Sequence, residues 1–117
     1  MKAILIDVTA QTVTDIDIQP GLSAMYTAIG CQCVDRRVLD NRNDLWFDDE
    51  GLLHEPQAPK FRFGNYPHPF AGNALICGYN NEGETISTTL TADQIRPYIR
   101  FLGDLHIEPQ GPVIISF

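Results

Sequence analysis

Basic residues are scarce in this sequence. Eight lysines and arginines stand against fifteen aspartates and glutamates, and the formal net charge is −7. Nucleic acids and anionic membranes are bound mainly through lysine and arginine, so the sequence predicts neither as a direct partner. An acidic surface favours an encounter with a basic surface on another protein. The alternative is that the acidic residues only keep the protein soluble.

Long apolar runs are also absent. No stretch approaches the roughly 20 apolar residues of a membrane span. The run at residues 3–6 is too short for the hydrophobic part of a signal peptide. We therefore expect a soluble cytoplasmic protein.

Cysteines are few and irregularly spaced. Cys31 and Cys33 are expected on the same face of a strand, where the geometry for a disulfide is poor, and Cys77 lies far along the chain. Zinc sites usually combine two pairs of ligands, and one C-x-C pair with three scattered histidines lacks that pattern. We predict reduced thiols, no metal site and no cofactor.

The sequence also lacks the common catalytic and phosphate-binding motifs. His54, His68 and His106 are far apart, and a small enzyme that uses Cys77 or a histidine remains an alternative, for instance through Cys77 with His68. Cys77 belongs to an apolar run, however, and a buried thiol is inert. Binding without catalysis is therefore the predicted activity.

The composition is that of a globular protein. A length of 117 residues and a hydrophobic fraction of 44% predict one domain, residues 1–117, with its own core. The apolar patterns predict an α+β fold: a mostly antiparallel sheet of five to seven strands with two helices packed on one face. The expected strands are residues 2–8, 12–18, 31–39, 45–47, 52–53, 74–79, 84–90 and 113–117.

Two helices are predicted from apolar periodicity and end signals. Residues 22–29 carry one apolar stripe, and Gly30 can adopt the left-handed conformation that ends a helix. The second helix is expected to run from a capping box of Thr91 and Gln94 to about residue 102. Pro97 either kinks this helix or marks its true first turn, because proline lacks an N–H.

Residues 44–55 are predicted to be the centre of the fold. An apolar triplet at residues 45–47 and an apolar pair at residues 52–53 flank an acidic turn, which is typical of a hairpin. Gly51 is expected to take a positive φ in this turn. Residues 55–72 are rich in proline and aromatic side chains and are interpreted as a long ordered loop, with a possible short strand at 60–63. Such loops are often functional, or the loop only covers the core.

The candidate binding site combines this acidic turn with the aromatic loop. Acidic residues in turns are commonly only solvated, and Phe47 and Phe70 are the aromatic residues expected in the core. Aromatic and arginine side chains also dominate protein interfaces and stack on nucleotide bases. The predicted binding residues are Trp46, Asp48, Asp49, Glu50, Arg62, Tyr66 and His68.

Two motifs resemble a family of small proteins of unknown function that are carried by phages, plasmids and their bacterial hosts. They are the acidic turn at residues 48–53, Asp-Asp-Glu-Gly-Leu-Leu, and the strand at residues 72–76, Gly-Asn-Ala-Leu-Ile. The resemblance covers roughly residues 22–95. It implies an accessory protein of a mobile element, and it supplies no reaction and no site.

The functional hypothesis is non-catalytic binding in the cytoplasm of a bacterial host cell. The expected partner is a host protein with a basic surface, for example a defence component. The oligomeric state is left open, and a dimer is allowed. A second hypothesis is a protein that sequesters a nucleotide or another small molecule with Arg62, Tyr66 and Trp46.

Overall fold

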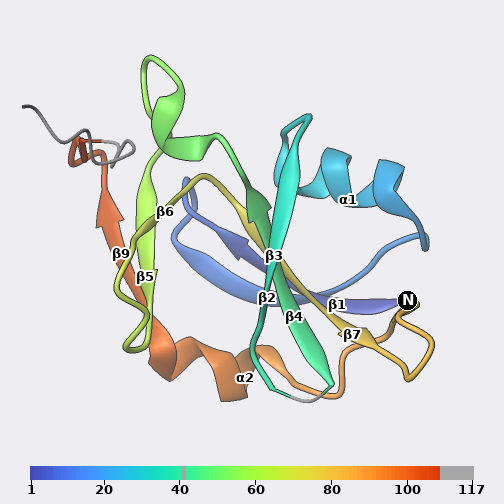
Figure 1. The fold of residues 1–117 in the computed structure, drawn as a ribbon. Helices are drawn as coiled ribbons and strands as arrows, with labels where there is room; N and C mark the ends of the chain where they lie inside the picture. Colours follow the sequence, from blue (N-terminus) through green and yellow to red (C-terminus); the bar gives the residue numbers. More distant parts are fainter. Residues whose placement is uncertain (41, 109–117) are drawn as a thin grey trace, which may run out of the picture.

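The chain begins with an antiparallel hairpin, formed by the two strands that were expected at residues 2–8 and 12–18. The computed structural model, which describes residues 1–40 and 42–108, pairs Asp7 with Thr12 across a short turn (Figure 1). Ile4 and Ile6 point to one face of the sheet and Ala3 to the other, because side chains alternate along a strand.

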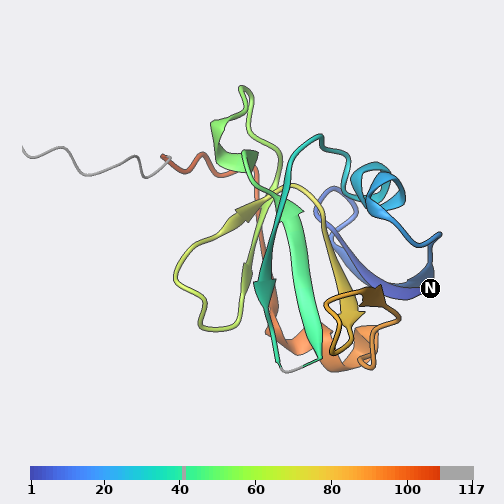
Figure 2. The ribbon, with the colours of Figure 1, turned by 45° about the vertical axis from the view of Figure 1, so that its right-hand side comes forward.

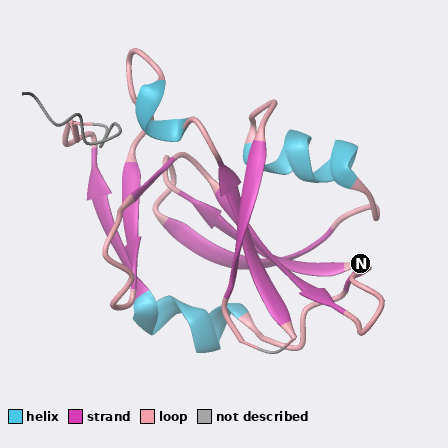
Figure 3. Ribbon diagram, in the orientation of Figure 1, coloured by secondary structure: helices cyan, strands magenta, loops and turns pink. Residues whose placement is uncertain are grey.

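Thirteen elements follow one another in the described residues (Figure 3). In chain order they are β1 (Lys2–Asp7), β2 (Thr12–Asp17), α1 (Leu22–Ile29), β3 (Val34–Val38), β4 (Asn43–Asp48), the 3₁₀ turn η1 (Gly51–Leu53), β5 (Lys60–Phe63), β6 (Phe70–Ala71), β7 (Ala74–Tyr79), β8 (Thr85–Ile86), α2 (Ala92–Ile95), the 3₁₀ turn η2 (Arg96–Tyr98) and β9 (Ile99–Gly103). The strand predicted at residues 113–117 lies outside the described residues.

The larger sheet is antiparallel throughout. Its strand order is β2-β1-β7-β4-β3, and β8 pairs with β7 next to the start of β1. β7 is the central strand, and both of its faces are covered, which explains why its sequence is continuously apolar instead of alternating.

A second, smaller sheet has the order β6-β5-β9. Phe61 and Phe70 from this sheet pack against Leu45, Phe47 and Ile76 of the larger one. We call this cluster the inter-sheet core. Figure 1 shows the small sheet on one side of the large sheet and α1 on the other, and Figure 2 shows the same arrangement after rotation.

The opposite face of the large sheet is covered by α1. Met25 and Ile29 of the helix pack on Ala3, Leu75 and Cys77, and we call this cluster the helix-side core. Ala92 and Ile95 of α2 belong instead to the inter-sheet core. The single α+β domain is thus confirmed, whereas the expectation of one sheet with both helices on one face is wrong.

The first helix has the predicted bounds, and the second is much shorter than predicted. α1 ends at Gly30, which has φ 81°. Thr91 and Gln94 form the predicted capping box, but α2 ends at Ile95 and Pro97 lies in η2. Residues 99–103 then form β9, which pairs with β5, so their apolar side chains serve a strand and not a helix.

The hairpin predicted at residues 44–55 does not form. Residues 43–48 are β4, which pairs with β3 and β7, whereas Leu52 and Leu53 belong to η1. The glycines with positive φ do not include Gly51. Earlier in the chain, β3 begins only at Val34, so Cys31 and Cys33 lie outside it. Later in the chain, β8 covers only part of the predicted return strand.

Residues 55–72, interpreted as a loop, contain two strands of the small sheet. β5 coincides with the short strand considered at residues 60–63, and Phe61 pairs with Phe70 of β6. In the described part of the chain, no helix is long and apolar enough to cross a membrane.

Candidate functional site

A cleft opens where the two sheets meet, and it has a volume of about 670 Å³. One wall comes from the end of β4 and from η1, and the other from β5, β6 and the turn between them. Ile107 and Glu108 also line the cleft. This volume lies within the range of roughly 300–1,000 Å³ that is usual for ligand sites.

The rings of Phe47, Phe70 and Tyr66 line the floor of the cleft. They belong to a longer row of aromatic rings. Phe70 lies at its centre, with ring centroids at 4.7 Å from Phe47, 5.2 Å from Phe61 and 5.3 Å from Tyr66. Phe47, Phe61 and Phe70 are buried in the inter-sheet core, while Tyr66 is only partly buried and carries the row to the surface. The core itself therefore holds Tyr66 in place.

Arg37 of β3 stands at one side of the floor in a fixed orientation. Its Nε donates to the Tyr66 hydroxyl at 3.0 Å, and its Nη1 donates to Asp35 at 2.7 Å. The guanidinium also lies 5.4 Å from the centroid of the Phe47 ring, within the range of a cation–π contact. The hydrogen bonds to Tyr66 and Asp35 raise the pKa of Arg37.

Arg62 and His68 bring further polar groups to the wall formed by β5, β6 and the turn between them. Arg62 donates to the carbonyl of Pro67 over a long 3.4 Å, and no carboxylate among the described residues lies within ion-pair distance of it. His68 is exposed and meets Tyr66 edge-on, with ring centroids 5.9 Å apart. Arg62 is thus the less restrained of the two cleft arginines.

The opposite wall carries carboxylates. Asp48 accepts the backbone N–H of Glu50 at 2.9 Å, and its other oxygen lies 2.9 Å from Nε2 of His54. Asp49 follows on the exposed side of the turn. The cleft therefore has acidic groups on one wall, Arg62 on the other and Arg37 of β3 beside its aromatic floor.

Gly51 sets the distance between η1 and β6. A Cβ at this position would lie 2.5 Å from the carbonyl oxygen of Ala71 and 3.3 Å from the Ala71 Cβ. Glycine is needed here for close backbone contact, and not for the positive φ expected from the sequence. Both residues line the cleft, so this contact also fixes its shape.

The structure brings most of the predicted binding residues together. Asp48, Asp49, Arg62, Tyr66 and His68 all line the cleft. The sequence alone does not show that these residues come from two separate walls.

The remaining two predicted residues lie elsewhere. Glu50 is exposed in the same turn, and it is not among the cleft residues. Trp46 packs against the helix-side core beneath Arg36, whose Cζ lies 5.6 Å from the ring centroid. The cause is strand alternation: Phe47 points toward the cleft, so its neighbour Trp46 points away.

Sequence reasoning missed Arg37 and the apolar lining from η1. The signal for Arg37 was the alternation of residues 34–38, which places Arg37 on one face with Asp35. Leu52 had been assigned to a strand, so its position at the cleft could not be foreseen.

Two buried groups lie on the other face of the large sheet. Cys77 has no exposed surface, and burial, followed by the charge of Asp44, raises the pKa of its thiol to about 12. Asp44 is 3% exposed, and its Oδ1 has no hydrogen-bond partner among the described residues. Burial raises the pKa of Asp44, while Arg36 opposes this shift.

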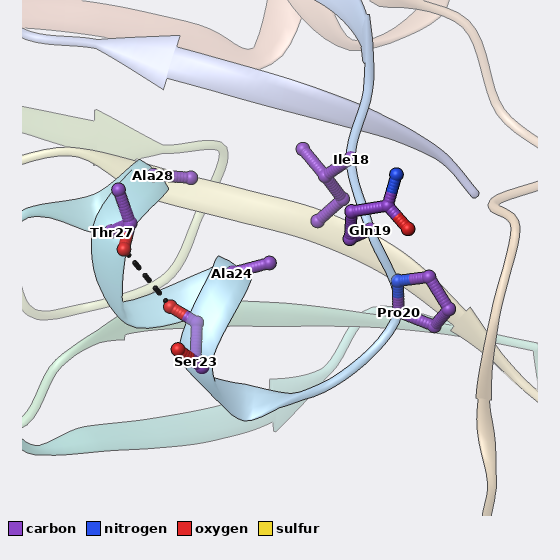
Figure 4. A pocket seen from close by; sticks show the side chains of 7 residues that line it. All are labelled: Ile18, Gln19, Pro20, Ser23, Ala24, Thr27 and Ala28. Atoms are coloured by element: carbon purple, nitrogen blue, oxygen red, sulfur yellow. Dashed lines mark hydrogen bonds between the residues drawn. The ribbon is translucent and has the colours of Figure 1, made fainter.

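A shallower groove lies between α1 and the segment that follows β2 (Figure 4). Its helix side carries only small side chains such as Ser23, Ala24 and Thr27, and the Thr27 hydroxyl already donates to the Ser23 carbonyl at 3.0 Å. Over residues 1–40 and 42–108, no three His, Cys, Asp or Glu side chains are arranged to hold a metal ion. The cleft is therefore the better candidate site.

Comparisons with curated proteins and with solved structures gave no match. One family matches residues 1–103, a range that includes every described strand and helix, both walls of the cleft and the segment whose resemblance was noted from the sequence. Since this match covers well over half of the sequence, the chain belongs to the family described as a domain of unknown function (DUF3846).

Proposed function

We propose that this protein binds a partner protein through the cleft, without a catalytic step. The observation that carries the proposal is the cleft itself, where Asp48 and Asp49 line the same cavity as Arg62 and Tyr66, with aromatic rings at its floor. Such a floor offers apolar contact area, and the charged walls select a segment by its charges.

The partner segment that fits best is basic and contains an apolar side chain. Asp49 is exposed on the acidic wall, and the net charge of −7 attracts a basic surface at long range. An apolar side chain beside the basic one would cover Tyr66 and Phe70. We expect the encounter to weaken as salt rises, because exposed charges are screened.

A pull-down from bacterial lysate tests this proposal with a matched pair of variants. Asp48→Lys/Asp49→Lys reverses two charges in the cleft, and Glu82→Lys/Glu84→Lys makes the same change in the turn before β8. A stoichiometric partner should be lost by the first variant, kept by the second, and released by salt. Equal retention by both variants would contradict the proposal.

We also propose that the protein is an accessory protein of a phage or plasmid that acts in the bacterial cytoplasm on a host protein, such as a defence component. The resemblance of residues 22–95 to proteins of mobile elements supports this assignment. Expression of the chain in a host that carries a defence system should raise phage infection, and the Asp48→Lys/Asp49→Lys variant should not. An identical effect of both would count against it.

A nucleotide or another anionic small molecule is the second candidate ligand. The supporting observation is that Arg62 has no carboxylate partner among the described residues and lies at the same cleft as Arg37 and the Tyr66 ring. A ligand that binds the folded state raises its melting temperature by mass action. A screen of nucleotides by thermal shift, with Arg62→Ala as control, separates this function from protein binding.

A catalytic alternative would depend on His54 more than on Cys77. A buried thiol with a pKa of about 12 supplies no thiolate near neutral pH, whereas His54 is paired with a carboxylate at the edge of the cleft. If an activity is found, His54→Ala should abolish it, while Cys77→Ala should not.

A further inference from the structure

β3 forms an edge of the large sheet. It pairs with β4 on one side, and no described strand pairs with the other. Cys33 and Leu39, which flank the strand, hydrogen-bond to Asp49 and Asn43 on the β4 side. Because the direction of hydrogen bonding alternates along an antiparallel strand, the N–H and C=O groups of Val34, Arg36 and Val38 point outward.

Side chains from the strand itself occupy the middle of this edge. Asp35 accepts the N–H of Arg36 at 2.7 Å, and Arg37 donates to the carbonyl of Arg36 at 3.0 Å. Asp35 and Arg37 are also joined to each other at 2.7 Å. Edge strands commonly carry charged side chains that protect the edge, because free backbone groups attract other strands.

The sequence of β3, Val-Asp-Arg-Arg-Val, is complementary to itself. If a second copy runs antiparallel and the two-fold axis passes through Arg36, each Asp35 lies opposite the Arg37 of the other copy. Each Val34 then lies opposite a Val38, whose exposed fraction of 68% is the highest among the large hydrophobic side chains of the described residues.

We propose that β3 is a homodimerisation edge, where two copies join their large sheets by pairing β3 with β3 around Arg36. In this register the outward residues form the hydrogen-bonded pairs. Asp35 of one copy and Arg37 of the other form the non-hydrogen-bonded pairs, in which opposite side chains are closest. The salt bridge inside each chain is thus exchanged for two between the chains, and backbone groups replace the side chains that bonded to Arg36.

The like charges of the two Arg36 side chains are compensated within each chain. Each guanidinium lies 5.6 Å from the centroid of its own Trp46 ring and 3.6 Å from the carboxylate of Asp44. A five-residue strand pair buries less surface than a standard protein interface, so the dimer belongs to the weak, transient class.

Sedimentation of the purified chain, from about 10 µM to about 1 mM, is the first test, because weak dimers appear only at high concentration. We expect a reversible monomer–dimer equilibrium. A chain that stays monomeric over this range overturns the proposal. The test uses no partner protein, so its result is independent of the proposed function of the cleft.

Charge exchange tests the register. Asp35→Lys places like charges opposite each other in its own dimer, and so does Arg37→Asp, so each should dimerise about tenfold or more weakly. A mixture of the two variants should form a heterodimer, because both of its cross-strand pairs then have opposite charges. The double variant Asp35→Lys/Arg37→Asp should dimerise like the natural chain.

A control variant and a second contact complete the test. Glu82→Lys changes a charge in the turn between β7 and β8, outside β3, and should leave dimerisation unchanged. If a variant at position 35 or 37 does not fold, as judged by circular dichroism, Val38→Lys is tested in its place. This variant removes the apolar contact between Val34 and Val38 and should weaken dimerisation. Dimerisation unaffected by Val38→Lys, or a mixture that stays monomeric, overturns the proposed pairing.

Discussion

Replacement of Gly51 by alanine should loosen the cleft and destabilise the fold. The added Cβ would lie 2.5 Å from the Ala71 carbonyl oxygen, whereas carbon–oxygen contacts rarely fall below about 3.3 Å. η1 and β6 must therefore separate by roughly 0.8 Å. Insertion of a methyl group into such tight packing costs about 1–3 kcal/mol.

The assay is thermal unfolding followed by circular dichroism. For a domain of this size about 1 kcal/mol corresponds to about 4 °C, so Gly51→Ala should lower the melting temperature by about 4–12 °C. Amide chemical shifts measured by NMR should change mainly in residues 48–53 and 64–72. These are the segments that the forced separation moves.

Gly83→Ala is the matched control. No atom lies within 4 Å of its added Cβ, and its φ of 78° costs about 1 kcal/mol from the left-handed conformation alone. It should leave the chemical shifts of the cleft unchanged. A melting temperature of Gly51→Ala within about 1 °C of the natural protein would refute the reasoning from the Ala71 contact.

Three further outcomes are expected. Phe70→Ala removes the central ring of the aromatic row and should lower the free energy of unfolding by about 3–5 kcal/mol in urea titrations. The control Leu105→Ala, at an exposed position, should change it by less than about 0.5 kcal/mol. Similar losses in both variants would contradict the assignment of Phe70 to the core. Burial raises the pKa of Asp44, so the folded state binds this proton more tightly than the unfolded state, and stability declines as pH rises from the ordinary aspartate value through the raised one. Asp44→Asn should therefore stabilise the protein more near neutral pH than at acidic pH, and thermal melts that show the reverse order would be inconsistent with a raised pKa. Cys77 should react with a thiol reagent only after unfolding, whereas the exposed Cys33 should react in the native state. Mass spectrometry of the digested protein distinguishes the two cysteines. Equal reaction rates would mean that Cys77 is accessible in the folded protein.

Elements specified by neighbouring residues were predictable from the sequence. α1 has its apolar stripe and its terminal glycine within nine residues, and the hairpin of β1 and β2 needs only a short turn. The capping box at Thr91 was likewise a local signal. In each case the residues that determine the element lie within it or next to it.

Elements that depend on distant partners were not predictable in the same way. Residues 45–47 are apolar because β4 lies inside the large sheet with a core on each face, and not because Leu52 and Leu53 return beside them. Residues 99–103 fit a helix pattern in sequence, yet β5 is available for pairing and Pro97 ends the helix before they begin. Tertiary pairing overrides local preference in both places.

The candidate site was predictable in composition but not in arrangement. The charged and aromatic residues of the turn and of residues 62–68 could be selected by type, and five of them line one cleft. The face on which Trp46 lies required the exact phase of β4, and the role of Arg37 required its contact with Tyr66 from the turn between β5 and β6. Neither piece of information is contained in a single local segment.

The central position of β7 has a consequence for synthesis of the chain. β7 separates the β1–β2 hairpin from the β3–β4 pair, and it begins at Ala74, some seventy positions after β1. The two pairs cannot join until this strand has left the ribosome, so a nascent chain that stops at residue 73 would hold two unconnected hairpins with bare apolar faces. We expect assembly to be late and abrupt, and the growing chain to depend on chaperones until then.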